Sequence, residues 1–296
     1  MDKEYVLSLS YGKDSIACLE AIKILGYPLD RIVHAEVWAT DAISADLPPM
    51  VEFKAKADKI IKERYGIEVE HICAMKDGRR MTYERGFYHI PQPRKNTQKI
   101  GGGCAEGSLQ GNKTGATRFS NEPRWKGFPE RTAPWCQNLK IYAKGDAPRP
   151  KKNTVRYLGI AADEPERIER HKDKAVLPLV DIGWDEAYCR KWCEENDLLS
   201  PIYTEATRGG CWFCHNQGVD QLRLLRKNYP ELWKILLKWD NDSPWTFKQD
   251  GHTVHDYDRR FEQEERGWCP TDRRFKWKML DVDEPLLQCY EESKER

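Results

Sequence analysis

The fold of this chain follows from one stretch, YVLSLSYGKDSIACLEAIKIL, which occupies residues 5–25. Residues 5–9 form an apolar run that predicts a strand, and residues 16–25 have the apolar spacing of a helix. Between them lies SYGKDS, a turn that leads from the strand into the helix. The unpaired amides and positive dipole end of such a helix favour an anion. The stretch therefore predicts an α/β fold with a phosphate site at residues 10–15.

The side chains of this turn fit the same chemistry. Ser10 and Ser15 offer hydroxyl donors, Gly12 lets the backbone approach a ligand closely, and Lys13 supplies a mobile cation. The spacing matches neither the Walker A loop nor the dinucleotide fingerprint. An ordinary strand-to-helix turn with a serine N-cap is the alternative interpretation.

The composition limits the class of protein. The chain has 296 residues and is 33% charged, but its net charge is only +1, so a nucleic acid would have to bind a local basic patch. No run approaches the roughly 18 apolar residues of a membrane span, and residues 1–10 do not resemble a secretory signal. We therefore expect a cytoplasmic protein with no membrane contact, whose ten cysteines are thiols or metal ligands.

Strand-like and helix-like runs alternate along the chain, which favours βαβ units. We expect a doubly wound, Rossmann-like parallel sheet over residues 1–182, followed by a largely helical, cysteine-containing region at residues 183–296. The strands after the first are expected at residues 31–39, 67–73, 155–160 and 177–181. The helices after the first are expected at residues 49–65, 135–144, 184–196 and 219–239, with a further one opening at residues 163–166.

A basic, glycine-rich insert without periodicity runs from about residue 76 to residue 131. It predicts either an irregular surface loop or a docking arm for a nucleic-acid acceptor. In the docking arm, arginines would contact phosphates and aromatic side chains would stack on bases. The aromatic candidates are Phe87, Tyr88, Phe119 and Trp125.

A second group of residues has the spacing of a metal site. Cys211 and Cys214 form a CxxC turn, and a tetrahedral metal needs two further ligands. Cys136 is the best candidate for the third ligand. The alternative candidates for the fourth ligand are Cys104, Cys269 and His215. Structural zinc would take four protein ligands, whereas an iron–sulfur cluster held by three cysteines would leave one iron open. The remaining cysteines in predicted elements are expected to be buried thiols: Cys18, Cys73, Cys189 and Cys193.

Several motifs together resemble one family over most of residues 1–266. They are SYGKDS, WCQNLK, LGIAADEPERIER, GWDEAYCRKWCEEN and RGGCWFCHNQ. These motifs are similar to the phosphoadenosine phosphosulfate reductase-like branch of the PP-loop ATP pyrophosphatase and adenine nucleotide alpha-hydrolase superfamily, as found in phages and bacteria. The resemblance implies the fold of that superfamily.

The resemblance also implies a bound adenine nucleotide, ATP or a relative, with Mg²⁺. Lys13, Asp14 and Ser15 would be the catalytic residues of the loop. The nucleotide would contact Ser10, Tyr11, Gly12, Lys13, Asp14, Ser15, Thr40, Asp41, Gly159, Asp163 and Glu164. Simple capping of a turn or helix is the other interpretation of Asp14 and Asp41.

The reaction implied by the family is adenylation of an acceptor with release of pyrophosphate, followed by sulfur transfer at the cysteine site, which would hold zinc or a 4Fe-4S cluster. A sulfur donor protein and a second copy of the chain would be partners. A sulfonucleotide reductase is the alternative, although Cys289 lies outside the tail motif of those enzymes and residues 159–164 lack their arginine. A nucleotide sensor without turnover is the third interpretation.

Overall fold

The computed structural model describes residues 3–89, 127–129, 135–143, 153–205 and 210–281. The chain divides into two compact units, one formed by residues 1–86 and 135–214 and the other by residues 87–134 and 215–296. The CxxC turn therefore belongs with the first unit, whereas the division expected from the sequence falls at residue 182. Within the described residues, no helix is long and apolar enough to cross a bilayer.

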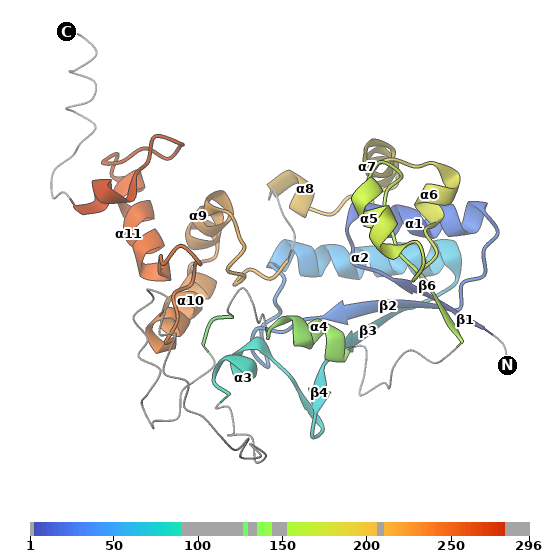
Figure 1. Ribbon diagram of the computed structural model, residues 1–296, viewed down its shortest axis with the longest axis horizontal. Coiled ribbons are helices and arrows are strands. Elements are labelled where there is room, and N and C mark those ends of the chain that lie inside the picture. Colours follow the sequence, from blue (N-terminus) through green and yellow to red (C-terminus); the bar gives the residue numbers. More distant parts are fainter. Residues whose placement is uncertain (1–2, 90–126, 130–134, 144–152, 206–209, 282–296) are drawn as a thin grey trace, which may run out of the picture. The chain divides into compact units, whose positions relative to one another are not determined.

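The first unit contains a four-stranded parallel sheet with the order β3-β2-β1-β6. The strands are β1 (Glu4–Ser8), β2 (Arg31–Glu36), β3 (Val69–Cys73) and β6 (Thr154–Tyr157). Helices α1 (Lys13–Ile24) and α2 (Pro48–Tyr65) lie on one side of the sheet, and α4 (Gln137–Ala143) lies on the other (Figure 1). The predicted α/β fold with a Rossmann-like parallel sheet is confirmed.

Strand β1 lies at the point where the order of the strands in this sheet reverses. It pairs in parallel with β2 on one side and with β6 on the other. In sheets of this kind, the loops that leave such a strand diverge and open a crevice at the carboxyl edge. Residues 10–12 are the loop that leaves β1.

The core of the first unit explains why residues 5–25 determine the fold. Leu7 of β1, Ile16 of α1 and Ile32 of β2 are all fully buried. Helix α1 is buried on most of its surface, because α6 (Pro178–Ile182) and α7 (Glu186–Glu195) also pack against it. The other helices of this region are α5 (Pro165–His171) and α8 (Ile202–Glu205).

The strand expected at residues 177–181 was wrong. This segment is helix α6, and the sheet is extended there only by a single bridge between Tyr157 and Val176. Pro178 explains the difference, because its fixed φ and missing N–H suit the first turn of a helix and interrupt a strand.

The beginning of the basic insert is regular, against expectation. It forms the hairpin strands β4 (Met75–Lys76) and β5 (Arg79–Arg80), followed by helix α3 (Tyr83–Phe87). Asp77 and Gly78 both have positive φ, which matches the twist that a tight hairpin requires. Phe119, Trp125 and Cys104 lie outside the described residues.

The second unit is helical and has an aromatic core. Its helices are α9 (Val219–Asn228), α10 (Pro230–Asp242) and α11 (Val254–Glu265), with a short 3₁₀ helix η1 (Trp277–Asp281). The single helix expected at residues 219–239 was wrong, because Pro230 starts a new helix after Tyr229. Phe87, expected to stack on bases, is instead fully buried against Phe128 and Trp239.

Candidate functional site

The predicted loop lies between β1 and α1, at the carboxyl edge of the sheet. Gly12 is the N-cap of α1, so no N-cap side chain satisfies the amides of the first helical turn. A Cβ atom added at Gly12 would lie 3.4 Å from the Tyr203 hydroxyl and 3.5 Å from Ser10 Oγ, which are ordinary contacts. The glycine is therefore not required by packing around the loop.

Two serines close the loop on itself. The hydroxyl oxygens of Ser10 and Ser15 are 2.9 Å apart, and the Ser10 amide donates to Ser15 Oγ over 3.2 Å. Ser15 Oγ also donates to the carbonyl oxygen of Gly12 over 2.9 Å. The side chain of Ser15 is thus part of the loop's internal bonding, and the serine N-cap interpretation is wrong because glycine is the N-cap.

Gly159 packs closely against the backbone of the loop. It lies just after β6, and a Cβ atom there would be 2.5 Å from the carbonyl oxygen of Asp14 and 2.6 Å from Cα of Ser15. No side chain fits in that space without moving backbone. The family resemblance implies that Gly159 contacts the nucleotide. In the structure Gly159 lies directly against the loop.

The ammonium group of Lys13 lies among carboxylates. It is 2.6 Å from Asp14 Oδ1 and 3.3 Å from Glu186 Oε2, and the side chain is 10% exposed. Burial lowers the pKa of Lys13, but the hydrogen bond and attraction of Asp14 and Glu186 outweigh it and raise the pKa overall. Lys13 is therefore charged at neutral pH.

Asp14, Glu164 and Glu186 form an acidic cluster around this lysine. It is the one group of three metal-ligating side chains in the described part of the chain whose ligand atoms all lie within 4.8 Å of one another. Burial raises the pKa of Asp14, and Glu186 and Glu164 add to the rise while Lys13 opposes it. Oxygen ligands of this kind suit Mg²⁺, which would relieve the repulsion among the carboxylates.

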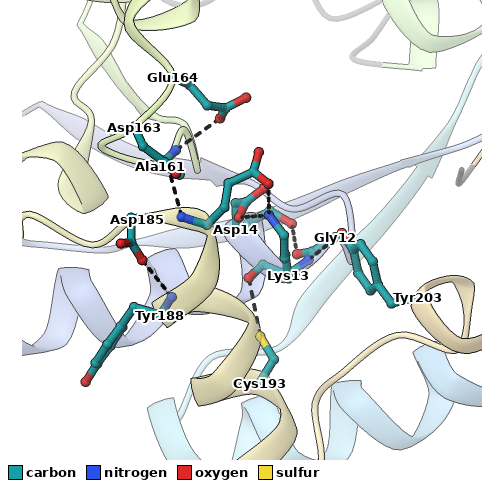
Figure 2. Close-up of polar contacts among 12 residues, drawn as sticks. Gly12, Lys13, Asp14, Ala161, Asp163, Glu164, Asp185, Tyr188, Cys193 and Tyr203 are labelled. Atoms are coloured by element: carbon teal, nitrogen blue, oxygen red, sulfur yellow. Dashed lines mark hydrogen bonds and ion pairs between the residues drawn. The ribbon is translucent and has the colours of Figure 1, made fainter. Parts of the chain in front are cut away.

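The acidic cluster is fixed by backbone hydrogen bonds from the segment after β6 and the first turn of α7. Glu164 accepts from the Ala161 amide over 3.2 Å, and Asp163 accepts from the Glu186 amide over 3.0 Å. Figure 2 shows Lys13 and Asp14 next to these two segments. Asp163 therefore positions Glu186, whereas Glu164 is itself a member of the cluster.

Sequence reasoning missed three residues that contact the loop. Glu186 pairs with Lys13, the Tyr203 hydroxyl accepts the Lys13 amide over 3.1 Å, and Cys193 Sγ donates to the Lys13 carbonyl oxygen over 3.4 Å (Figure 2). The acidic N-terminus of α7 was visible in the sequence. Its proximity to residue 13 was not, because it depends on how α7 packs against α1.

Thr40 and Asp41 have partners outside residues 10–15. Thr40 Oγ1 accepts from the amides of Ala42 and Ile43, and Asp41 pairs with Arg85 over 2.5 Å. Tyr11, also expected at the nucleotide, has its side chain fully buried under the loop. The side chain of Tyr11 is therefore not available to contact a ligand.

Two of the segments expected at a metal site, the one with Cys136 and the CxxC turn with Cys211 and Cys214, both pack against Tyr83. The Tyr83 ring lies 4.9 Å from that of Trp135 and 4.1 Å from that of Phe213, residues that adjoin Cys136 and Cys214. Burial raises the pKa of Cys211 to about 12 and that of Cys136 to about 11. The three sulfur atoms do not all lie within 4.8 Å of one another, which is wider than a single zinc ion held by all three would require.

The remaining cysteines have other surroundings. Cys269 belongs to the second unit, where its Sγ is 3.8 Å from the carbonyl oxygen of Arg260. Cys18, Cys189 and Cys193 are buried as expected, whereas Cys73 is half-buried. His215 is buried and follows Cys214 directly.

Comparison of the chain with protein-family models, with curated proteins and with solved structures gave no match.

Proposed function

We propose that the first unit binds ATP or a related adenine nucleotide at residues 10–15 and transfers its adenylyl group to an acceptor. The observation that carries the proposal is the placement of the Lys13 ammonium at the uncapped start of α1, beside the acidic cluster of Asp14, Glu164 and Glu186. A cation and the amides of a helix N-terminus suit phosphate, and the carboxylates suit Mg²⁺. The three together are what a magnesium nucleotide requires.

The reaction follows from this arrangement of charges. An oxygen atom of the acceptor attacks the α-phosphorus, and the bond to the β-phosphate oxygen breaks. Pyrophosphate leaves, and the acceptor carries AMP. Lys13 and the amides of the first helical turn would stabilise the charge that builds on the leaving pyrophosphate. Mg²⁺ held by the acidic cluster would neutralise charge on the phosphates.

Sulfur transfer is the second part of the proposal. A sulfur nucleophile supplied by a donor protein would displace AMP from the adenylated acceptor. Cys136, Cys211 and Cys214 are the residues that would hold zinc or an iron–sulfur cluster for this step. The support is that the rings of Trp135 and Phe213, which adjoin Cys136 and Cys214, both pack on Tyr83.

The test is adenylation by the purified full-length protein. The protein is incubated with labelled ATP, Mg²⁺ and candidate RNA or DNA, and pyrophosphate release and label transfer are measured. Lys13→Met is expected to lower the rate about 10²- to 10³-fold. Lys23→Met, which removes an exposed lysine from the last turn of the same helix, is the matched control and should keep the wild-type rate.

Four outcomes would contradict this function. No pyrophosphate or AMP release with any acceptor would exclude adenylation, and tight nucleotide binding without product would indicate a sensor. Thioredoxin-dependent release of sulfite from adenylylsulfate would instead indicate a sulfonucleotide reductase. Equal rates for Lys13→Met and the wild type would remove the assigned role of the loop.

A further inference from the structure

A partly buried set of polar contacts connects the phosphate loop to the sheet and to α2. The loop residue at its centre is Tyr11, and the other members come from β2, β3, α2 and the segment before α2. We call this set the Tyr11 network, and its members are Tyr11, His34, Glu36, Asp46, Lys54, Asp58 and His71.

Tyr11 has an unusual backbone conformation for its residue type. Its φ is 56°, in the left-handed region, which costs a non-glycine residue about 1 kcal/mol or more. The side chain is fully buried, its hydroxyl donates to Asp58 Oδ1, and its oxygen is 3.1 Å from His71 Nε2. These contacts compensate the backbone cost and hold Tyr11 in place.

His71 is the charged member beside Tyr11. Its Nδ1 is 2.9 Å from Glu36 Oε1 and its Nε2 is 2.8 Å from Asp58 Oδ2. Both ring nitrogens face carboxylate oxygens, so both must donate, and the ring is an imidazolium. In agreement, the hydrogen bonds to Asp58 and Glu36 raise the pKa of His71 to about 9.

His34 is the neutral member, and it holds the residue before the loop. Lys54 Nζ lies 2.8 Å from His34 Nε2, so Nε2 accepts and Nδ1 donates to the Leu9 carbonyl oxygen over 2.8 Å. Burial lowers the pKa of His34 to about 4, and Asp46 balances the charge of Lys54 over 2.5 Å. The network therefore binds both neighbours of Ser10, Leu9 through its backbone and Tyr11 through its side chain.

We infer that Tyr11 and Asp58 are positioning residues of the phosphate loop. Their hydrogen bond fixes the backbone of residues 9–13 in the shape that directs the first amides of α1 toward an anion. Breaking it would loosen the loop and weaken phosphate binding while the sheet stays intact. The effect on phosphate binding rests on the proposed function, whereas the effect on loop rigidity does not.

Tyr65 provides a matched control within the same unit. It lies on α2, as Asp58 does, and its hydroxyl donates to Glu20 Oε2 of α1 over 2.8 Å. Tyr65→Phe therefore removes the same kind of tyrosine–carboxylate bond as Tyr11→Phe, but away from the loop. A general loss of stability would affect both variants alike.

The first readout is hydrogen exchange of peptides that cover residues 9–16, measured by mass spectrometry in the full-length protein. Tyr11→Phe is expected to speed exchange there about tenfold, as loss of a hydrogen bond to a charged group predicts. Tyr65→Phe should leave these peptides at the wild-type rate. Unchanged exchange in Tyr11→Phe, or an equal rise in both variants, would overturn the inference.

The second readout is the affinity for inorganic pyrophosphate with Mg²⁺, measured by calorimetry. Tyr11→Phe should bind about tenfold more weakly than the wild type and Tyr65→Phe. Wild-type protein that binds no pyrophosphate would contradict the proposed function, and the exchange result would still decide the role of Tyr11. Wild-type affinity in a Tyr11→Phe protein with a loosened loop would show that loop rigidity does not control binding, against the inference.

A second pair of variants serves if Tyr11→Phe does not fold. Asp58→Ala removes the acceptor of Tyr11, and Glu20→Ala removes the acceptor of Tyr65. Asp58→Ala should again speed exchange at residues 9–16 about tenfold, with Glu20→Ala unchanged. Equal exchange in these two variants would count against the inference.

Discussion

At the residue scale, the loop depends on positions where a few atoms matter. Gly159 leaves no space for a methyl group beside Asp14 and Ser15, whereas Gly12 leaves room for one. The two glycines therefore have different roles. Gly159 is required by packing, and Gly12 is required only if a ligand approaches the loop.

Gly159→Ala should destabilise the first unit by about 2–3 kcal/mol, because overpacking against backbone cannot be relieved by a side-chain rotation. Urea unfolding followed by fluorescence measures the loss. Gly12→Ala is the matched control and should stay within about 0.5 kcal/mol of the wild type. A fully stable Gly159→Ala protein would show that the loop and the segment after β6 are not in contact.

His71 should make stability depend on alkaline pH. Its pKa is raised in the folded state, so its contribution is complete below its unfolded value of 6.5 and is lost as pH rises to about 9. We expect a loss of about 1–2 kcal/mol over this range, less than the full shift because the ring is partly exposed. Unfolding in urea at several pH values measures it, and His71→Gln should remove the dependence. A flat wild-type profile between these values would contradict the imidazolium assignment.

At the element scale, α7 connects the fold to the site. Its N-cap Asp185 accepts the Tyr188 amide over 2.7 Å, its first turn carries Glu186, and its buried face carries Cys193. Glu186 therefore reaches Lys13 only while the first turn of α7 is helical.

Asp185→Ala should lower the stability of the first unit by about 1 kcal/mol, because the cap of α7 is lost. It should also weaken Mg²⁺ binding, since Glu186 lies in the frayed turn. Chemical unfolding and magnesium titration by calorimetry measure the two effects. Asp185→Ser keeps a capping oxygen and should restore both, whereas a deficit that serine does not restore would mean that charge rather than capping is responsible.

Two elements that sequence reasoning placed incorrectly share one cause. Pro178 and Pro230 each begin a helix, where the sequence pattern predicted a strand and an uninterrupted helix. A proline is compatible with the first turn of a helix because the amides there have no intrahelical partner. The spacing of apolar residues alone does not show that a proline starts a new helix.

At the scale of the whole molecule, the chain forms two compact units whose segments alternate along the sequence. Each has its own core, with Leu7 in the parallel sheet of the first and Phe247 among the aromatic residues of the second. Core mutations should therefore act mainly on the unit that contains them.

Leu7→Ala should cost the first unit about 2–5 kcal/mol, and Phe247→Ala should cost the second about 3–5 kcal/mol. Hydrogen exchange of peptides from both units localises each loss. Leu7→Ala is expected to raise exchange in β1 and β2, and Phe247→Ala in α10 and α11. Equal exchange across both units in either variant would indicate a single cooperative structure.

The sequence by itself determined the strand, loop and helix of residues 5–25 and the parallel sheet that they join. These depend on apolar periodicity and on a turn between neighbouring residues, which are local properties. Sequence reasoning also selected Lys13, Asp14, Gly159 and Glu164, all of which the structure brings together.

Only the tertiary structure decided which residues surround that loop. Glu186, Tyr203 and the partners of Tyr11 come from positions tens to nearly two hundred residues away in the chain. Their contacts depend on how α7, α8 and α2 pack, and a side chain that bonds across such a distance leaves no periodic signal in the sequence. The burial of Tyr11 is the clearest case, because its neighbours Ser10 and Gly12 have the pattern of a ligand loop while its own side chain points into the core.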